Sequence, residues 1–130
     1  MANLSAVQIM GAPAPLGPYS PAIRSGAFLF CSGQVGLDPA TGKPVPGGTV
    51  AELRKALVQV DALLKAAGLT SGAVVRCTLF LTDMGDFKAV NAAYAEFFPG
   101  SPKPARSCVA VAALPAGARV EIEVLAAFPD

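Results

Sequence analysis

Histidine is absent from this chain of 130 residues. Its absence excludes Ser-His-Asp and Cys-His nucleophile systems, every histidine-ligated metal site and the commonest general base of enzymes. Any chemistry must therefore come from carboxylates, arginine, cysteine, tyrosine, serine, lysine, backbone groups and water. The three cysteines, Cys31, Cys77 and Cys108, are far apart and form no CxxC pair, which argues against a disulfide framework and against zinc and fits reduced thiols in the cytosol.

Charge is also scarce, because only 15% of the residues are charged, against ~25% in an average soluble domain. The ten basic and nine acidic residues are spread evenly and leave a net charge of +1. No basic block is present to neutralise a phosphate backbone, so the sequence does not indicate a dedicated nucleic-acid-binding protein. The hydrophobic fraction of 53% excludes an intrinsically disordered chain.

Long hydrophobic runs are missing too. No run approaches the ~18 uncharged apolar residues that span a bilayer, and the most apolar stretch, 109–114, ends at Pro115. Residues 1–10 carry no positive charge ahead of their apolar residues, so they do not resemble a signal peptide. A short chain with so few charges cannot cover its whole surface with them. We therefore expect a soluble cytoplasmic protein, a single domain over 1–130, with apolar surface buried against copies of itself in a homo-oligomer.

Hydrophobic periodicity predicts strands and helices in a simple order. The predicted strands cover 22–24, 27–35, 73–81, 105–112 and 119–127, and the predicted helices cover 49–67 and the stretch between Asp86 and Pro99. The order β-β-α-β-α-β-β is typical of an α+β domain with two helices packed on one face of one sheet. The other face carries apolar residues as well, and a neighbouring subunit is the simplest cover for it.

Side chains at the helix ends give more specific predictions. Thr49 and Glu52 match a capping box at the start of the first helix, and Gly68 stands where a left-handed cap ends it. Asp86 is expected to cap the second helix. The predicted inner face of the second helix consists of Phe87, Val90, Tyr94 and Phe97.

Arg106 is the first candidate for chemistry, because it begins an otherwise apolar strand and its permanent charge must find an anion. One interpretation is a salt bridge with an acid on a nearby strand, and the other is a bidentate fork for the carboxylate of a small ligand. Glu121 and Glu123 are two residues apart on one strand and so share a face. They suggest either an ion-pair network or a carboxylate for acid–base catalysis, and their spacing does not say which acid would act.

Several weaker candidates each have a plainer structural interpretation. Asn91 lies on the flank of the inward helical face and needs hydrogen-bond partners, which a nearby loop could supply. Ser32 and Gly33 interrupt the end of an apolar strand, as a ligand-binding turn or merely a bulge would. Cys108 shares a strand face with the arginine but is more typical of a small core residue. Tyr19, beside Pro18, is either a ligand contact or a packing aromatic.

Several short motifs recur together along nearly the whole chain. They are Gly17-Pro18-Tyr19-Ser20, Ser32-Gly33-Gln34, Asp86-Phe87 to Asn91, Phe97-Phe98-Pro99, Pro104-Ala105-Arg106-Ser107-Cys108, Leu114-Pro115 and Val120-Glu121-Ile122-Glu123. On these motifs the sequence resembles the Rid family of reactive intermediate deaminases, also called the YjgF family. The resemblance implies a chorismate-mutase-like α+β fold, assembled as a homotrimer with a cleft between each pair of subunits.

The resemblance also implies an activity. Archetypal Rid proteins hydrolyse enamine and imine intermediates, such as 2-aminoacrylate, 2-iminopropanoate and 2-iminobutanoate, to 2-keto acids and ammonia, without a cofactor or metal. By position, Arg106 would bind the substrate carboxylate and Glu121 would activate water. The pocket would be lined by Tyr19, Ser32, Gly33, Asn91 and Cys108. The alternatives are a trimer that binds small carboxylates, or acts as a chaperone, through the same cleft without turnover, and a ribonuclease, which the lack of histidine and of a basic patch argues against.

Overall fold

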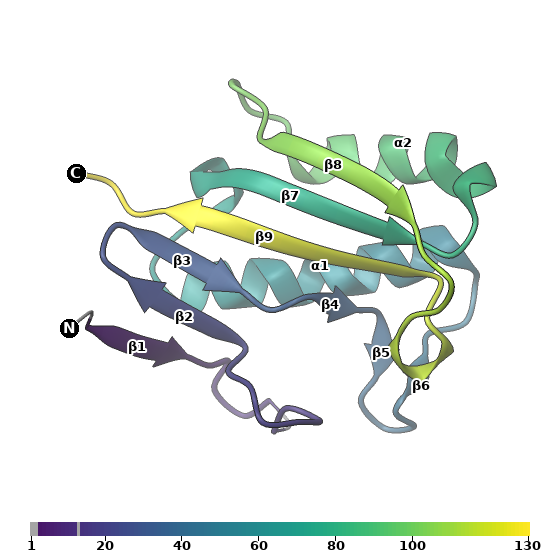
Figure 1. Ribbon diagram of the computed structural model, residues 1–130, viewed down its shortest axis with the longest axis horizontal. Helices are drawn as coiled ribbons and strands as arrows, with labels where there is room; N and C mark the ends of the chain where they lie inside the picture. Colours follow the sequence, from purple (N-terminus) through teal and green to yellow (C-terminus); the bar gives the residue numbers. More distant parts are fainter. Residues whose placement is uncertain (1–2, 13) are drawn as a thin grey trace.

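Two helices lie on one face of a single mixed sheet in the computed structural model, which describes residues 3–12 and 14–130 (Figure 1). The strands of this sheet run in the order β1-β2-β3-β9-β7-β8, and β4 extends the sheet beside β9. All pairs are antiparallel except β7 with β8, which is parallel. The α+β architecture with both helices on one face is therefore confirmed.

The elements have the following bounds. The strands are β1 Leu4–Val7, β2 Ala22–Ser25, β3 Phe28–Cys31, β4 Gln34–Val35, β5 Leu37–Asp38, β6 Lys43–Pro44, β7 Val74–Leu81, β8 Ala105–Ala110 and β9 Val120–Ala127, and the helices are α1 Thr49–Ala66 and α2 Phe87–Phe97. Short 3-10 turns occupy Ser71–Ala73, Met84–Asp86 and Pro115–Gly117. No helix among the described residues is both long and apolar enough to cross a bilayer.

The extra strands are short. The predicted strand 27–35 is interrupted at Ser32 and Gly33, and its two halves, β3 and β4, both pair with β9. The segment between the predicted strand 27–35 and the predicted helix 49–67 contains the hairpin β5–β6, in which Leu37 pairs with Pro44. Strand β1 pairs with β2 at one edge of the sheet. These short strands are defined by their pairing with a neighbouring strand, because their own sequences are too short to show a clear alternation of apolar and polar residues.

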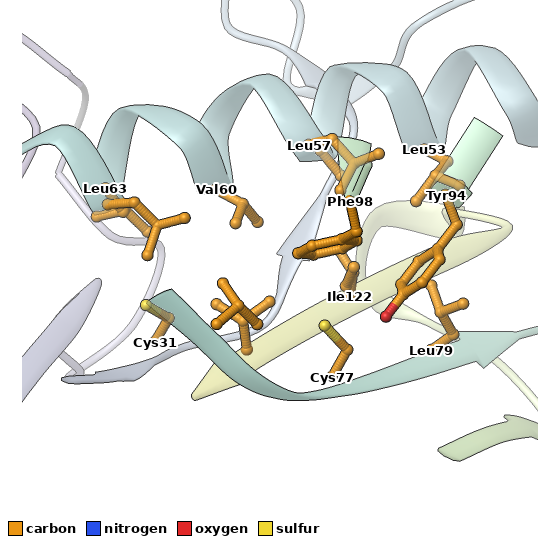
Figure 2. Close-up of a cluster of buried hydrophobic side chains, with 14 of the residues drawn as sticks. Cys31, Leu53, Leu57, Val60, Leu63, Cys77, Leu79, Tyr94, Phe98 and Ile122 are labelled. Carbon is orange, nitrogen blue, oxygen red and sulfur yellow. The ribbon is translucent and has the colours of Figure 1, made fainter. Parts of the chain in front are cut away.

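The core lies between the helices and one face of the sheet (Figure 2). Its helical side is a stripe of α1 with the 3.6-residue period that the sequence predicted, and every member is buried: Leu53, Ala56, Leu57, Val60, Leu63 and Leu64. The sheet side comes from alternate residues of the central strands, including Leu79 of β7 and Ile122 of β9, which are fully buried. The period-2 alternation then sends Glu121 and Glu123 to the opposite, open face.

The open face carries large apolar side chains. Phe28 and Phe30 on β3 are 43% and 50% exposed, with their ring centroids 6.5 Å apart. A shallow hollow of about 230 Å³ on this face is lined by Phe30, Arg76, Thr78 and Glu123, among others. Apolar surface on the second face of the sheet is therefore present, as the composition suggested.

The predicted helix caps are partly wrong. Gly68 is confirmed: it has φ 78°, its N–H donates to the Lys65 carbonyl at 2.9 Å, and it ends α1. The capping box is not formed. Helix α1 begins at Thr49 after Gly48, and the Thr49 hydroxyl instead donates to Asp86 Oδ2 at 2.7 Å. Glu52 accepts from the backbone N–H of Arg119 at 2.8 Å.

The Asp86 cap is wrong for the same reason, since its carboxylate accepts from a distant hydroxyl and makes no bond to the start of α2. Asp83 caps the turn just before, accepting from the N–H of Gly85 at 2.8 Å. On the predicted inner face of α2, Val90 and Tyr94 are buried, whereas Phe87 is 37% exposed. At both predicted caps, the side chains thus hydrogen-bond to residues distant in sequence and not to the helix end beside them.

Candidate functional site

Arg106 lies on β8 with its side chain toward the helices. It stands opposite Cys77 in the parallel β7–β8 ladder, and Cys77 is fully buried on the helix side of the sheet. The Arg106 Nη1 donates to Asn91 Oδ1 on α2 at 2.7 Å. Its guanidinium carbon lies 4.8 Å from the ring centroid of Tyr94 and 5.6 Å from that of Phe87. The guanidinium is therefore half-buried between an amide and two aromatic rings.

The three neighbours of Arg106 on α2 form one stripe. Phe87, Asn91 and Tyr94 are spaced i, i+4 and i+7, which places them on one side of a helix. Asn91 was singled out from the sequence as a site residue, and its amide oxygen serves the arginine rather than a loop. Phe87 and Tyr94 were predicted only as packing residues. Their spacing from Asn91 is the signal that could have added them to the site.

No carboxylate neutralises Arg106 within the described part of the chain. The ion pairs found there are Arg54–Glu96, Lys65–Asp61 and Arg119–Glu52. A guanidinium has five N–H donors, and Asn91 is the one side-chain acceptor that the described residues offer it. The salt-bridge interpretation of Arg106 is therefore wrong within one chain, which leaves the charge available to an anion from outside.

Cys108 follows on the same face of β8, opposite Leu79 of β7. It is half-buried, and burial raises the pKa of its thiol while the positive charge of Arg106 opposes that rise. Cys77 is deeper, and its pKa is raised by burial against the lowering effects of Tyr94 and Arg106. Both thiols are thus predominantly protonated near neutral pH, and no three Cys, Asp or Glu side chains of the described residues gather as a metal site requires.

Glu121 lies on β9, on the open face, against Gly33. A Cβ atom added to Gly33 would come within 2.8 Å of Glu121 Cδ, so a side chain at residue 33 would displace the carboxyl group from this position. Burial raises the pKa of Glu121, and the neighbouring charge of Glu123 raises it further. A carboxyl group whose pKa moves toward neutrality suits proton transfer to and from water. No ion pair to either acid is found among the described residues, so the ion-pair network is not formed within one chain.

The segment around Tyr19 is tied to the strand end beside Glu121. The Ser32 hydroxyl donates to the Ser20 carbonyl at 2.7 Å, and the Ser32 N–H donates to the Pro21 carbonyl at 2.8 Å. Tyr19, next along the chain, is 51% exposed rather than packed. The structure therefore places Ser32, Gly33 and Glu121 together and holds the Tyr19 segment close to them.

The candidate residues thus form two groups. Arg106, Asn91 and Cys108 lie on the helix-covered face at the β8 edge, which we call the arginine group. Tyr19, Ser32, Gly33 and Glu121 lie around β4 and the open face, and we call them the glutamate group. Arg106 and Glu121 are two strands apart and point to opposite faces of the sheet, because Arg106 pairs with buried Cys77 and Glu121 pairs with Phe80 on the alternate face. One chain does not bring them together.

Comparisons with known proteins give this arrangement a context. The sequence profile of the family described as Endoribonuclease L-PSP matches residues 9–128. The chain is a member of this family, the YjgF/Rid family. It is 51% identical to the mouse 2-iminobutanoate/2-iminopropanoate deaminase over 115 residues, which are 88% of this chain and 84% of that protein. It is 49% identical to protein DfrA of Myxococcus xanthus, covering 88% of each.

The fold comparison agrees. The crystal structure of E. coli TdcF with bound serine is 36% identical in sequence and superposes with a TM-score of 0.88, covering 96% of this chain and 99% of TdcF. The resemblance found in the short motifs is therefore confirmed over almost the full length of this YjgF/Rid protein.

Proposed function

We propose that this YjgF/Rid protein hydrolyses short-lived 2-imino and 2-enamino acids to 2-keto acids and ammonia. The observation that carries the proposal is the Arg106 guanidinium, held by Asn91 and without a carboxylate partner among the described residues. Such a planar fork suits the carboxylate that every substrate of this class carries. The name of the mouse relative and the serine bound to TdcF, itself an amino acid with a carboxylate, support the same ligand class.

The proposal includes a homotrimer with its sites between subunits. Arg106 and Glu121 point to opposite faces of the sheet in one chain, so they can act on one ligand only if they come from two chains. The exposed phenylalanines of β3 make the open face suitable for burial against a second copy. The arginine group of one subunit would then face the glutamate group of the next.

The chemistry follows from the two groups. Arg106 would hold the carboxylate and so fix the adjacent C=N carbon, and Glu121 would take a proton from water as the water oxygen bonds to that carbon. Returning that proton to nitrogen gives a carbinolamine, which carries OH and NH2 on the same carbon. Transfer of the hydroxyl proton to nitrogen, through the same carboxylate, then breaks the C–N bond, so ammonia leaves and a C=O double bond remains. An enamine first gains a proton on carbon and loses one from nitrogen, becoming the imine. The balanced products are one 2-keto acid and one ammonia for each water consumed.

The family description raises a ribonuclease as another activity. A net charge of +1 and the absence of histidine offer neither a basic surface for a phosphate backbone nor the usual bases of that reaction. The proposed mechanism uses neither a metal nor a cofactor. We propose the cytoplasm as the location of the protein.

Mixed oligomers test both the activity and the shared site. An amino-acid oxidase or a serine/threonine dehydratase generates the imine, and release of the 2-keto acid is followed. Arg106→Ala and Glu121→Gln should each be inactive alone, whereas co-assembly in equal amounts should restore about a quarter of the wild-type rate per site, because one site in four combines both intact groups. Arg54→Ala, which removes an exposed arginine, is the matched control and should keep full activity.

Two results would contradict the proposal. Wild-type protein that leaves imine decay unchanged while binding 2-keto acids would show a binding protein without turnover. Mixed oligomers that recover nothing, although each variant assembles and the wild type is active, would place both groups of a site in one chain.

A further inference from the structure

The Arg106 guanidinium lies beside two aromatic rings in addition to making its hydrogen bond with Asn91. Asn91 engages only Nη1, and one bond to one nitrogen leaves the guanidinium plane free to turn about that contact. The rings of Tyr94 and Phe87 lie at 4.8 Å and 5.6 Å from the guanidinium carbon, within the range of cation–π attraction. The described residues give Arg106 no ion pair that could fix its orientation instead.

Tyr94 is fixed in the core. It is 8% exposed, and its ring packs on Phe98 with centroids 4.7 Å apart. Its hydroxyl points toward β7, near Cys77 and Leu79 (Figure 2), and has no nitrogen or oxygen partner. The Cys77 thiol is its polar neighbour there, and burial, followed by the hydrogen bond with this thiol, raises the pKa of Tyr94. The hydroxyl thus has only a thiol as a polar neighbour, whereas the ring lies between the Phe98 ring and the Arg106 guanidinium.

Phe87 completes the arrangement from the rim. It lies two helical turns before Tyr94 on α2 and is 37% exposed, which is unusual for an aromatic ring on the sheet-facing side of a helix. One ring thus approaches the guanidinium from the core and the other from the solvent side, while Asn91, between them in sequence, holds one nitrogen.

We propose that Tyr94 and Phe87 are positioning residues of the anion site, whose rings hold the Arg106 guanidinium plane so that the donors unused by Asn91 face the ligand carboxylate. The inference rests on the proposed function for the identity of the ligand, but its physical content is the orientation of one side chain. Misorienting the fork weakens ligand binding more than it slows the chemical step, because the rings do not touch the reacting carbon.

Binding of 2-oxobutanoate, a stable 2-keto acid, tests the proposal beside steady-state turnover. Tyr94→Leu should raise the Kd and the KM roughly tenfold with kcat changed less than about threefold, a size consistent with a partly desolvated cation–π contact. Phe87→Leu should raise both about threefold. Tyr94→Phe keeps the ring and should leave both within about twofold. Leu63→Ala, at the far end of α1 in Figure 2, opens a core cavity away from Arg106 and should lower stability without changing Kd.

A double-mutant cycle separates orientation from packing. In an Arg106→Lys background the cation has no plane to orient, so adding Tyr94→Leu should raise Kd by less than about twofold. An equal loss in the arginine and lysine backgrounds would overturn the proposal, as would an unchanged Kd in both ring variants. If Tyr94→Leu does not fold, Phe87→Leu decides through the same cycle, since its site is partly exposed.

The outcomes for the two proposals are distinguishable. Wild-type protein that binds 2-oxobutanoate with the expected ring dependence but does not hydrolyse imines would sustain the positioning role and reject the deaminase function. Imine turnover whose KM is the same in Tyr94→Leu and Phe87→Leu as in the wild type would sustain the deaminase function and reject the positioning role. A wild type that shows neither saturable binding of 2-oxobutanoate nor turnover of imines would overturn both.

Discussion

The two faces of the sheet differ in how much of the candidate site a single chain completes. On the helix-covered face, Arg106 has an amide at 2.7 Å and two rings around it, all from α2. On the open face, Glu121 has Gly33 beneath it and Glu123 beside it, with no hydrogen-bonded partner among the described residues. A single chain thus supplies neighbours for the Arg106 side chain from α2, whereas it supplies no hydrogen-bonded partner for Glu121 among the described residues.

Under the proposed function, this difference makes ligand binding and acid–base catalysis separable properties. The contacts of the Arg106 guanidinium come from α2, so its orientation does not depend on the open face of the sheet. The pKa of the Glu121 carboxyl group depends on burial and on the like charge of Glu123, and both influences would change in the proposed oligomer, where a second copy would cover this face. The arginine group and the glutamate group should therefore respond differently to substitution, to subunit dissociation and to pH.

The largest effect is expected for Arg106→Ala. Loss of a charge-assisted bidentate contact should lower kcat/KM by roughly 10²- to 10⁴-fold. Thermal stability should fall much less than activity, because the side chain makes no ion pair in its own chain and loses there one hydrogen bond to Asn91 and its contacts with the rings of Tyr94 and Phe87. Activity assays, thermal melts and light scattering of the same sample measure activity, stability and assembly together. A variant that turns over at the parent rate would remove Arg106 from the site.

The second prediction compares the faces directly. Leu79→Ala removes a fully buried side chain from the covered face and should cost about 2–5 kcal/mol of unfolding free energy. Phe30→Ala removes a ring that is 50% exposed in one chain and should cost less than about 1 kcal/mol in the folding of that chain.

Association should reverse that order. If copies cover the open face, Phe30→Ala should shift dissociation to higher protein concentration, whereas Leu79→Ala should not do so beyond its loss of folded protein. Urea unfolding gives the first comparison, and sedimentation over a concentration series gives the second. An oligomer insensitive to Phe30→Ala would mean that another surface joins the subunits.

Much of the fold followed from period and turn chemistry. The α1 stripe and the Gly68 cap were predictable because each depends on neighbours within a few residues in sequence. The capping box was not, because Thr49 reaches Asp86 across the fold and Glu52 reaches the start of β9. A local sequence pattern does not show that a side chain will hydrogen-bond to a residue far away in the sequence and not to the nearby helix end.

The candidate site was predictable as residues but not as geometry. Alternation along β9 correctly put Glu121 and Glu123 on one face. Whether Arg106 shares that face depends on the parallel register of β7 with β8, which pairs it with Cys77, and no spacing within one strand contains that information. The ring of Tyr94 beside Arg106 depends on the same register and on how α2 lies across β7 and β8.

The smallest expected effect concerns pH and the open face. The pKa of Glu121 is raised in the folded chain, first by burial and then by Glu123, so the folded state binds this proton more tightly than the unfolded chain does. That contribution to stability is present below the ordinary carboxyl pKa and is lost as pH rises through the raised value. Glu121→Gln has no such loss, so its unfolding free energy relative to wild type should increase from about pH 4 to pH 7, by less than any of the effects above because the carboxyl group is only partly buried.

Glu123→Gln sharpens the same test, because it removes only the second cause of the shift. It should leave a smaller pH dependence at Glu121 and move the acid limb of the turnover profile to lower pH, since the like charge no longer opposes ionisation of Glu121. Urea unfolding of the wild type and both variants at fixed protein concentration, at pH 4, 5, 6 and 7, measures the first effect. A stability difference between wild type and Glu121→Gln that is flat or has the opposite slope would show that the carboxyl group is not buried where β4 meets β9.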